Sequence, residues 1–152
     1  MSEISDEGND KTERPTLGPN PDLQTLDRLI GTWTVSGEAE GIVTYEWAEG
    51  GFFLFQHVEL GGSIGLEIIG HDHRYGEEPS TDIRSHYYGL GEGETLDYTY
   101  EIVDDILTIW MGERGSPAYY EGTFNAEATT LTGAWHYPGG GGYSTVSTKA
   151  PR

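Results

Sequence analysis

The 152-residue sequence contains no cysteine and only two lysines. The missing thiols exclude disulfide bonds, thiolate metal ligands and cysteine nucleophiles. No long apolar run is present, so we expect no membrane-spanning helix. Residues 1–14 contain neither a basic segment nor an apolar one, which predicts that the chain has no secretory signal and is cytoplasmic.

Basic side chains are also scarce. The sequence has eight Lys and Arg residues against 26 acidic residues, which gives a formal charge of −18. Nucleic acids and anionic membranes are recognised through Lys and Arg, so we expect neither as a partner. An acid-rich, lysine-poor composition favours solubility at high salt, where surface charges are screened. Two interpretations stay open: a halophilic protein, and an ordinary acidic protein that its charge keeps soluble.

The chain divides into a polar tail and one domain. Residues 1–20 have almost no large apolar side chain, so they cannot offset their ordering entropy and are predicted to be a disordered acidic tail. Residues 21–152 are enough for one domain with a core of its own.

One short segment of this domain has a helical pattern. Leu23, Leu26 and Ile30 recur at offsets of three and four and predict one apolar helix face. Asn20 is placed to cap this helix, with Pro21 at its first position. We expect the helix to close one end of the fold.

The rest of the sequence consists of short β-type runs separated by glycine-rich turns. We predict strands over residues 33–40, 42–48, 52–60, 66–71, 82–88, 95–101, 106–111, 118–124, 130–137 and 143–148. Consecutive hairpins favour an all-β fold, an up-and-down antiparallel β-barrel of about ten strands with one short N-terminal helix.

Alternation within these runs separates two faces. Trp33 and Val35, Tyr98 and Tyr100, and Trp135 lie at alternate positions between small, polar or acidic residues, so we expect them to face the interior. The run at residues 52–55 is apolar at every position, which predicts packing on both of its faces, with the helix over one of them.

Four motifs resemble a known superfamily. They are Leu26-x-x-Leu29-x-Gly31-x-Trp33, Glu49-Gly50-Gly51-Phe52, Ile68-Ile69-Gly70 and Leu131-x-Gly133-x-Trp135. The first resembles the opening of the calycins, which include lipocalins and fatty-acid-binding proteins. The whole set, over residues 23–149, is similar to an uncharacterised bacterial and archaeal family of lipocalin-like domains of unknown function.

This resemblance implies a barrel whose closed end is plugged by Trp33, with Gly31 allowing a sharp entry into the first strand. The sequence departs from the lipocalin pattern in two respects. It lacks a Thr-Asp-Tyr segment, and it lacks a late arginine that could pack on the first tryptophan. Basic residues placed for a fatty-acid carboxylate are not evident either.

Six residues are candidates for ligand contacts: His57, Arg84, His86, Trp110, Tyr120 and His136. If their strand faces point inward, imidazoles and a guanidinium would line an aromatic cavity and suit a ligand with an anionic or carbonyl group. The two aromatic residues of this set are equally explained as core or cross-strand pairs. We therefore predict a non-enzymatic binder of a small, largely apolar molecule, and assign no cofactor, metal or catalytic residue.

Three alternatives stay open. The first is a histidine-dependent enzyme on the same barrel, such as a hydrolase, an isomerase or a haem-dependent catalyst. The second is a filled barrel that acts through its surface, for example as a homodimer. The third is a zinc site formed by His71, His73 and His86, for which a polar strand end is the competing interpretation.

Overall fold

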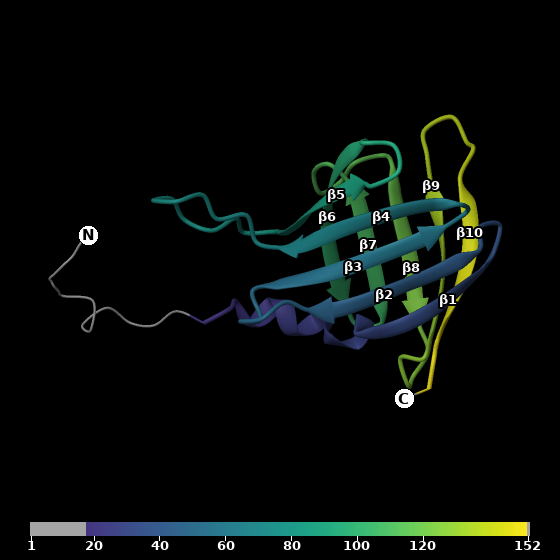
Figure 1. Ribbon diagram of the computed structural model, residues 1–152, viewed down its shortest axis with the longest axis horizontal. Helices are drawn as coiled ribbons and strands as arrows, with labels where there is room; N and C mark the ends of the chain where they lie inside the picture. Colours follow the sequence, from purple (N-terminus) through teal and green to yellow (C-terminus); the bar gives the residue numbers. More distant parts are fainter. Residues whose placement is uncertain (1–17, 152) are drawn as a thin grey trace, which may run out of the picture.

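The computed structural model describes residues 18–151 and is a closed barrel of ten antiparallel strands (Figure 1). The strands are β1 (Gly31–Gly37), β2 (Gly41–Trp47), β3 (Phe53–Leu60), β4 (Ser63–Gly70), β5 (Ile83–Gly89), β6 (Thr95–Val103), β7 (Ile106–Met111), β8 (Tyr119–Phe124), β9 (Thr130–His136) and β10 (Tyr143–Lys149). Each strand pairs with the next, and β1 pairs with β10 to close the ring. The predicted fold class is confirmed. Residues 1–17, most of the predicted tail, lie outside the described residues.

The predicted strand boundaries agree closely with the structure. The strand predicted over residues 106–111 coincides with β7. The largest differences are in β1, which spans Gly31–Gly37 rather than residues 33–40, and in β4, which begins at Ser63 rather than at Leu66. Gly61 and Gly62 both have positive φ angles, of 59° and 86°, so the turn between β3 and β4 is confined to these two residues. The ladder therefore continues to the edge of the turn.

The predicted helix is present as the 3₁₀ helix η2 (Pro21–Leu29). Asn20 caps it as expected, because its side-chain oxygen accepts a hydrogen bond from the Asp22 N–H at 3.0 Å. Its buried residues are Leu23, Leu26 and Leu29. A 3₁₀ helix has three residues per turn, so this spacing puts all three on one face. The apolar face predicted with Ile30 is thus corrected, since Leu29 takes that place.

Helix η2 closes one end of the barrel together with Trp33. The Trp33 side chain is 2% exposed, and its indole N–H donates to the Leu29 carbonyl at 2.8 Å. Its ring packs against that of Phe124, with centroids 6.3 Å apart. No helix in residues 18–151 is both long and apolar enough to cross a membrane.

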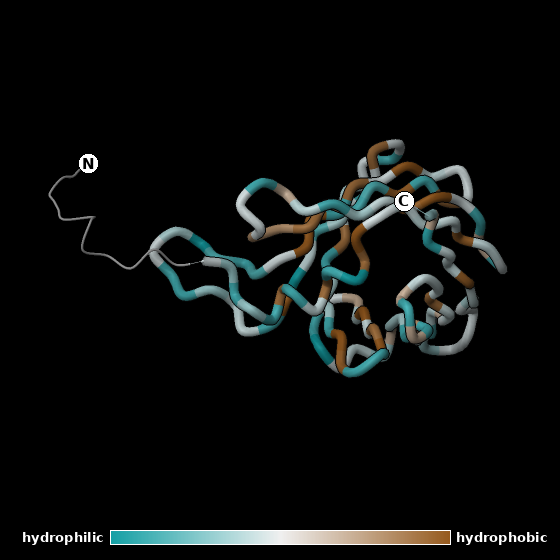
Figure 2. The backbone as a smooth tube through the Cα atoms, turned by 90° about the horizontal axis from the view of Figure 1, so that it is seen from below, coloured by the Kyte–Doolittle hydropathy of each residue, from teal (hydrophilic) through white to brown (hydrophobic). Residues whose placement is uncertain are grey.

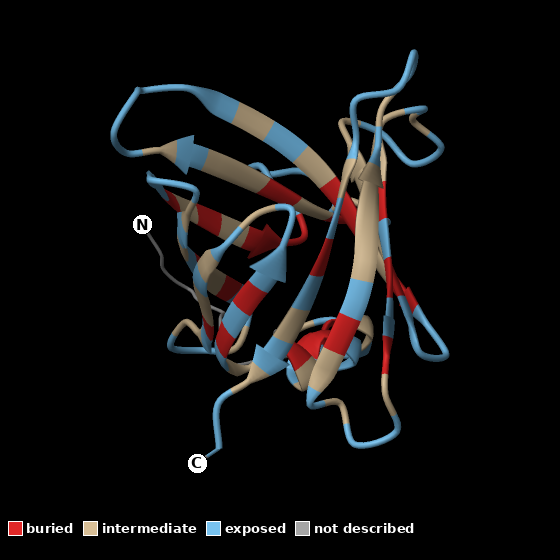
Figure 3. Ribbon diagram, turned by 90° about the vertical axis from the view of Figure 1, so that its right-hand side faces the viewer, coloured by how far each residue is buried: buried red, intermediate tan, exposed pale blue. Residues whose placement is uncertain are grey.

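The strands alternate between an inner and an outer face. Hydrophobic and hydrophilic residues follow one another along the tube in Figure 2, and Figure 3 shows buried and exposed residues alternating on strands that surround the buried part of η2. The expectation that residues 52–55 pack on both faces is wrong. Phe52 and Phe53 are 44% and 42% exposed, whereas Leu54 is fully buried. The reason is that η2 packs inside the barrel end, against Leu54 in one core cluster, and leaves the outer face of β3 open.

Candidate binding cavity

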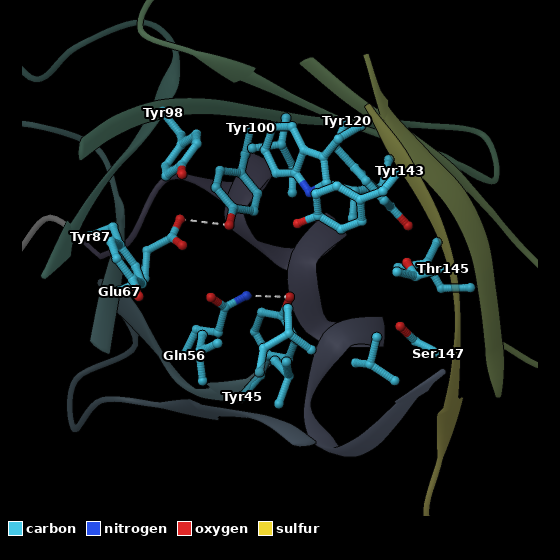
Figure 4. A pocket seen from close by; sticks show the side chains of 18 residues that line it. Tyr45, Gln56, Glu67, Tyr87, Tyr98, Tyr100, Tyr120, Tyr143, Thr145 and Ser147 are labelled. Atoms are coloured by element: carbon cyan, nitrogen blue, oxygen red, sulfur yellow. Dashed lines mark hydrogen bonds between the residues drawn. The ribbon is translucent and has the colours of Figure 1, made fainter. Parts of the chain in front are cut away.

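The barrel interior contains a cavity of about 240 Å³, so the barrel is not filled (Figure 4). Its apolar lining comes from seven aliphatic side chains: Val35, Val43, Val58, Leu60, Leu107, Ile109 and Leu131. Its aromatic and polar lining is Tyr45, Gln56, Glu67, Tyr87, Tyr98, Tyr100, Tyr120, Trp135, Tyr143, Thr145 and Ser147. An apolar cavity with a few grouped polar side chains is the usual form of a small-molecule site.

Four of the polar and aromatic side chains form a row across adjacent strands. Tyr45 on β2 lies opposite Gln56 on β3, Gln56 lies opposite Glu67 on β4, and Glu67 lies opposite Tyr87 on β5. Directly opposed residues of an antiparallel pair project to the same face of the sheet. The strand register therefore places all four side chains on one wall of the interior.

Glu67 is the acid of this wall. Its side chain is buried, and its Oε2 atom accepts hydrogen bonds from the Ser85 hydroxyl and the Tyr100 hydroxyl, each at 2.6 Å. Within the described part of the chain, no hydrogen bond reaches its other oxygen, Oε1. Burial raises the pKa of Glu67, and the two donated hydrogen bonds oppose this shift less strongly. The group can therefore act as a neutral acid or, beside a cation, as a carboxylate.

Gln56 and Tyr45 form a second polar pair next to Glu67. The Gln56 side-chain N–H donates to the Tyr45 hydroxyl oxygen at 2.5 Å, which leaves the Gln56 carbonyl oxygen on the same wall without a protein donor in residues 18–151. Burial is the largest of the causes that raise the pKa of Tyr45, so the phenol stays protonated. The wall formed by β2–β5 thus offers hydrogen-bond acceptors from Glu67 and Gln56.

The opposite wall is mainly aromatic. One residue from each of the strands β6–β10 lies directly opposite the next, and these residues are Tyr100, Ile109, Tyr120, Trp135 and Tyr143. The Tyr120 and Trp135 rings are in contact, with centroids 5.7 Å apart. Figure 4 shows Tyr143, Thr145 and Ser147 across the cavity from Glu67, so a ligand between the walls would touch rings and hydroxyl groups on one side and Glu67 and Gln56 on the other.

Glycines make room for two of the lining rings. A Cβ atom at Gly65 would collide with the Tyr87 ring, and one at Gly122 or Gly133 would collide with the Tyr120 hydroxyl. Inward-facing glycines therefore allow these tyrosines to lie along the sheet. The positions of the two rings, and with them the shape of the cavity, depend on the absence of a side chain at these three glycines.

Of the six residues predicted to contact a ligand, only Tyr120 lines the cavity. The inward orientation expected of the others is corrected, because their strand positions alternate with the lining residues. His57 is on the outer face, where it contacts Glu46 at 2.9 Å. His136 is also on the outer face, where its ring lies 4.9 Å from that of Tyr119.

The remaining three predicted residues lie on the outer face of β5 and β7. Arg84 contacts Glu113 at 3.0 Å, and His86 contacts Asp97 at 2.8 Å. Trp110 is covered by the Arg114 guanidinium, whose carbon lies 5.0 Å from its ring centre. These polar side chains therefore pair with neighbours on the surface and do not enter the cavity.

The zinc interpretation is also wrong. The two His71 ring nitrogens contact the Ser80 carbonyl at 2.7 Å and Asp22 at 2.8 Å. Both His86 ring nitrogens contact carboxylates, one of Asp72 at 2.9 Å and one of Asp97 at 2.8 Å. No group of three His, Asp or Glu side chains in residues 18–151 is arranged to hold a metal ion. His71 instead links the 71–82 segment to η2.

Gln56 and Glu67 were not predicted as site residues, although the sequence contains a signal for both. Gln56 stands between Leu54 and Val58 in the inward series of β3, and Glu67 stands between Gly65 and Ile69 in that of β4. A lone polar residue in an otherwise apolar face is costly unless it is hydrogen-bonded. Interruptions of this kind, rather than the histidines, mark the polar wall.

A scan of the sequence against protein-family models finds no match, and neither does a search of curated proteins. The role of the cavity must therefore be argued from its geometry. The decisive features are its volume, its aromatic wall and the buried acid on the facing wall.

Proposed function

We propose that this protein is a non-enzymatic binder of a small, largely apolar molecule held inside the barrel. The observation that carries the proposal is the 240 Å³ cavity, with grouped polar side chains on one wall and aromatic side chains on the other. At roughly 30 Å³ for each water, this volume equals about eight waters, which suits a ligand the size of one substituted ring.

The resemblance to calycins supports this proposal. The ten-stranded up-and-down barrel has its helix and Trp33 at one end, as that resemblance implies. Lys149 places its ammonium 5.0 Å from the centre of the Trp33 ring, so a late cation packs on this tryptophan although the late arginine of the lipocalin pattern is absent. We therefore propose a lipocalin-like protein, in which the space above the plugged end holds the ligand.

The lining also narrows the chemistry. No Lys, Arg or His side chain of residues 18–151 lines the cavity, so an anionic ligand would lose its hydration without gaining a cationic partner. The anionic or carbonyl-bearing ligand expected from Arg84 and the histidines therefore loses its basis. The alternative of histidine-dependent catalysis or haem ligation inside the barrel loses its basis for the same reason.

Calorimetry with 2-phenylethanol, a neutral probe with one ring and one hydroxyl, tests this function. We expect saturable binding to the full chain, and a rise in its melting temperature with probe concentration, because a ligand that binds only the folded state stabilises it. Val58→Phe places a ring in the cavity and should abolish both effects. His57→Phe adds the same ring one residue away on the outer face and should change neither.

Two results would contradict the proposal. One is the absence of binding by 2-phenylethanol and by a wider set of neutral and charged single-ring compounds. The other is equal binding by the wild type and Val58→Phe, which would place the probe outside the barrel.

A further inference from the structure

Glu67 is the one acid that lines the cavity in residues 18–151, and it is only 4% exposed. Its Oε2 atom is engaged by two hydroxyl donors, while no protein donor in these residues reaches Oε1. A buried carboxyl oxygen without a partner is costly, and it is usually satisfied by something bound. The adjacent Gln56 carbonyl oxygen is a second acceptor on the same wall, so once Glu67 is ionised this wall selects for hydrogen-bond donors.

The surroundings of Glu67 suit a cation better than a neutral donor. Tyr87 lies directly opposite it on β5, and Tyr45, Tyr98 and Tyr100 are near enough to interact electrostatically with it. The faces of aromatic rings attract ammonium groups, and more strongly where water is excluded. The formal charge of −18 adds a long-range field that draws cations towards the protein.

We propose that the ligand is a small amine, whose ammonium group pairs with Glu67 while its apolar part lies against the aromatic and aliphatic wall. This inference rests on the proposed function, because it concerns the same cavity. It assigns the polar end of the ligand to β3 and β4, and it gives the buried acid at this interior position a role.

Binding should be coupled to proton release wherever the empty barrel holds Glu67 in its neutral form. Burial favours the neutral form of Glu67 in the empty barrel. When an ammonium ion binds, the acid ionises and its proton passes to solvent, so that a neutral acid and a cation give an ion pair and a free proton. The groups that face Glu67 are Ser85, Gln56 and the four tyrosines, whose raised pKa values keep them neutral. His86, on the outer face of β5, contributes only a small opposing effect.

The test compares 2-phenylethylamine with 2-phenylethanol, which differ chiefly in the charged group. Calorimetry is carried out at several pH values from acidic to neutral, each in two buffers that differ in ionisation enthalpy. We expect the amine to bind at least about tenfold more tightly, as a charge-assisted hydrogen bond allows. Its apparent heat should differ between the buffers because a proton is released, and the heat for the alcohol should not.

Glu67→Gln keeps the shape of the side chain and removes its charge. We expect this variant to lose the preference for the amine, so that the two probes bind with similar affinity, and to lose the proton release. Glu46→Gln is the matched control, since Glu46 is an exposed acid paired with His57 on the outer face. It should leave both probes unaffected.

The outcomes separate this inference from the function on which it rests. Alcohol binding without a preference for the amine overturns the amine proposal and leaves the binding function intact, whereas failure of all probes overturns both. If Glu67→Gln does not fold, Tyr100→Phe removes one hydrogen bond to the carboxylate and keeps the ring. It should weaken amine binding selectively, and an unchanged ratio of the two affinities would overturn the proposal.

Discussion

The Lys149 ammonium lies 5.0 Å from the centre of the Trp33 ring and donates a hydrogen bond to the Arg28 carbonyl at 2.9 Å. The last strand is thereby joined to the first strand and to the last turn of η2. Carbonyl groups at the end of a helix lack partners within the helix, and a cation placed there is favourable. One side chain from the end of the chain thus stabilises the closed end of the barrel at two points.

Replacing Lys149 should loosen this end. We expect Lys149→Met, which keeps an apolar stem, to lower the free energy of unfolding by about 1–3 kcal/mol, since it removes a cation–π contact and a charged hydrogen bond. Lys149→Arg should recover part of the loss because it keeps the cation. Urea denaturation followed by tryptophan fluorescence measures both variants. Equal stability of Lys149→Met and the wild type would show that the contact contributes nothing.

The glycine beneath Tyr120 offers a test of cavity shape. In Gly133→Ala the new methyl group would collide with the β8 backbone at Glu121 and with the Tyr120 hydroxyl. We expect a loss of about 1–3 kcal/mol in the free energy of unfolding, as for other overpacked sites. Binding of 2-phenylethanol should weaken as well, because the ring of Tyr120 must shift.

Gly91→Ala is the control for this prediction. No atom lies within 4 Å of a Cβ placed at Gly91, and its φ angle is not positive. We expect a change within about 0.5 kcal/mol in the free energy of unfolding. Similar losses in both variants would mean that the effect belongs to alanine in place of glycine, and not to the collision with β8 and Tyr120.

The fold could be predicted because its signals are local. Alternation over Leu131, Gly133 and Trp135 identifies the inner face of β9 without any knowledge of its neighbours. Paired glycines such as Gly61 and Gly62 mark hairpins for the same reason. The cap and the leucines are enough to locate the helix. Its 3₁₀ type is not predicted, and for that reason Leu29 rather than Ile30 completes the buried face.

The site could not be predicted in this way. On β5, Ile83, Ser85 and Tyr87 point inward while Arg84, His86 and Tyr88 point outward, and both sets mix polar side chains with apolar or aromatic ones. Alternation therefore does not decide which face is which. The decision comes from pairing over long distances in the sequence, since Glu67 meets Ser85 and Tyr100, which are 18 and 33 residues away.

Glu67 should make stability depend on pH in a direction opposite to that of most acids. Its pKa is raised above the ordinary value of 4.5, so between that value and the raised one the folded protein holds a proton that the unfolded chain has released. The free energy of unfolding of the wild type should therefore fall with rising pH relative to that of Glu67→Gln. Urea titrations of the two proteins from acidic to neutral pH measure this difference. A difference that stays constant, or changes in the other direction, would contradict the raised pKa.

His86 should make the free energy of unfolding depend on pH above 6.5. Hydrogen bonds to Asp97 and then Asp72 raise its pKa above the ordinary value of 6.5. The stability that it contributes is thus fully present below 6.5 and is lost as the pH rises through the raised value. The contribution is small because the side chain is exposed and screened by solvent. NMR titration of the imidazole should show the raised pKa in the wild type and a lower pKa in Asp97→Asn. Equal values would rule out Asp97 as the cause.

Salt should stabilise this protein, because its 26 acidic residues far outnumber its eight basic ones and like charges repel one another. Raising potassium chloride from about 0.01 M to about 1 M shortens the Debye length from about 30 Å to about 3 Å and screens this repulsion. The few surface ion pairs, such as Arg114 with Asp82, lose strength over the same range, but they are far fewer than the acids. We therefore expect the melting temperature to rise with salt.

The same series in sucrose, which is uncharged, separates screening from general exclusion of solute. A halophilic protein should already unfold at the low-salt end, whereas an ordinary acidic protein should stay folded throughout. A melting temperature that falls with salt would show that ion pairing outweighs repulsion on this surface.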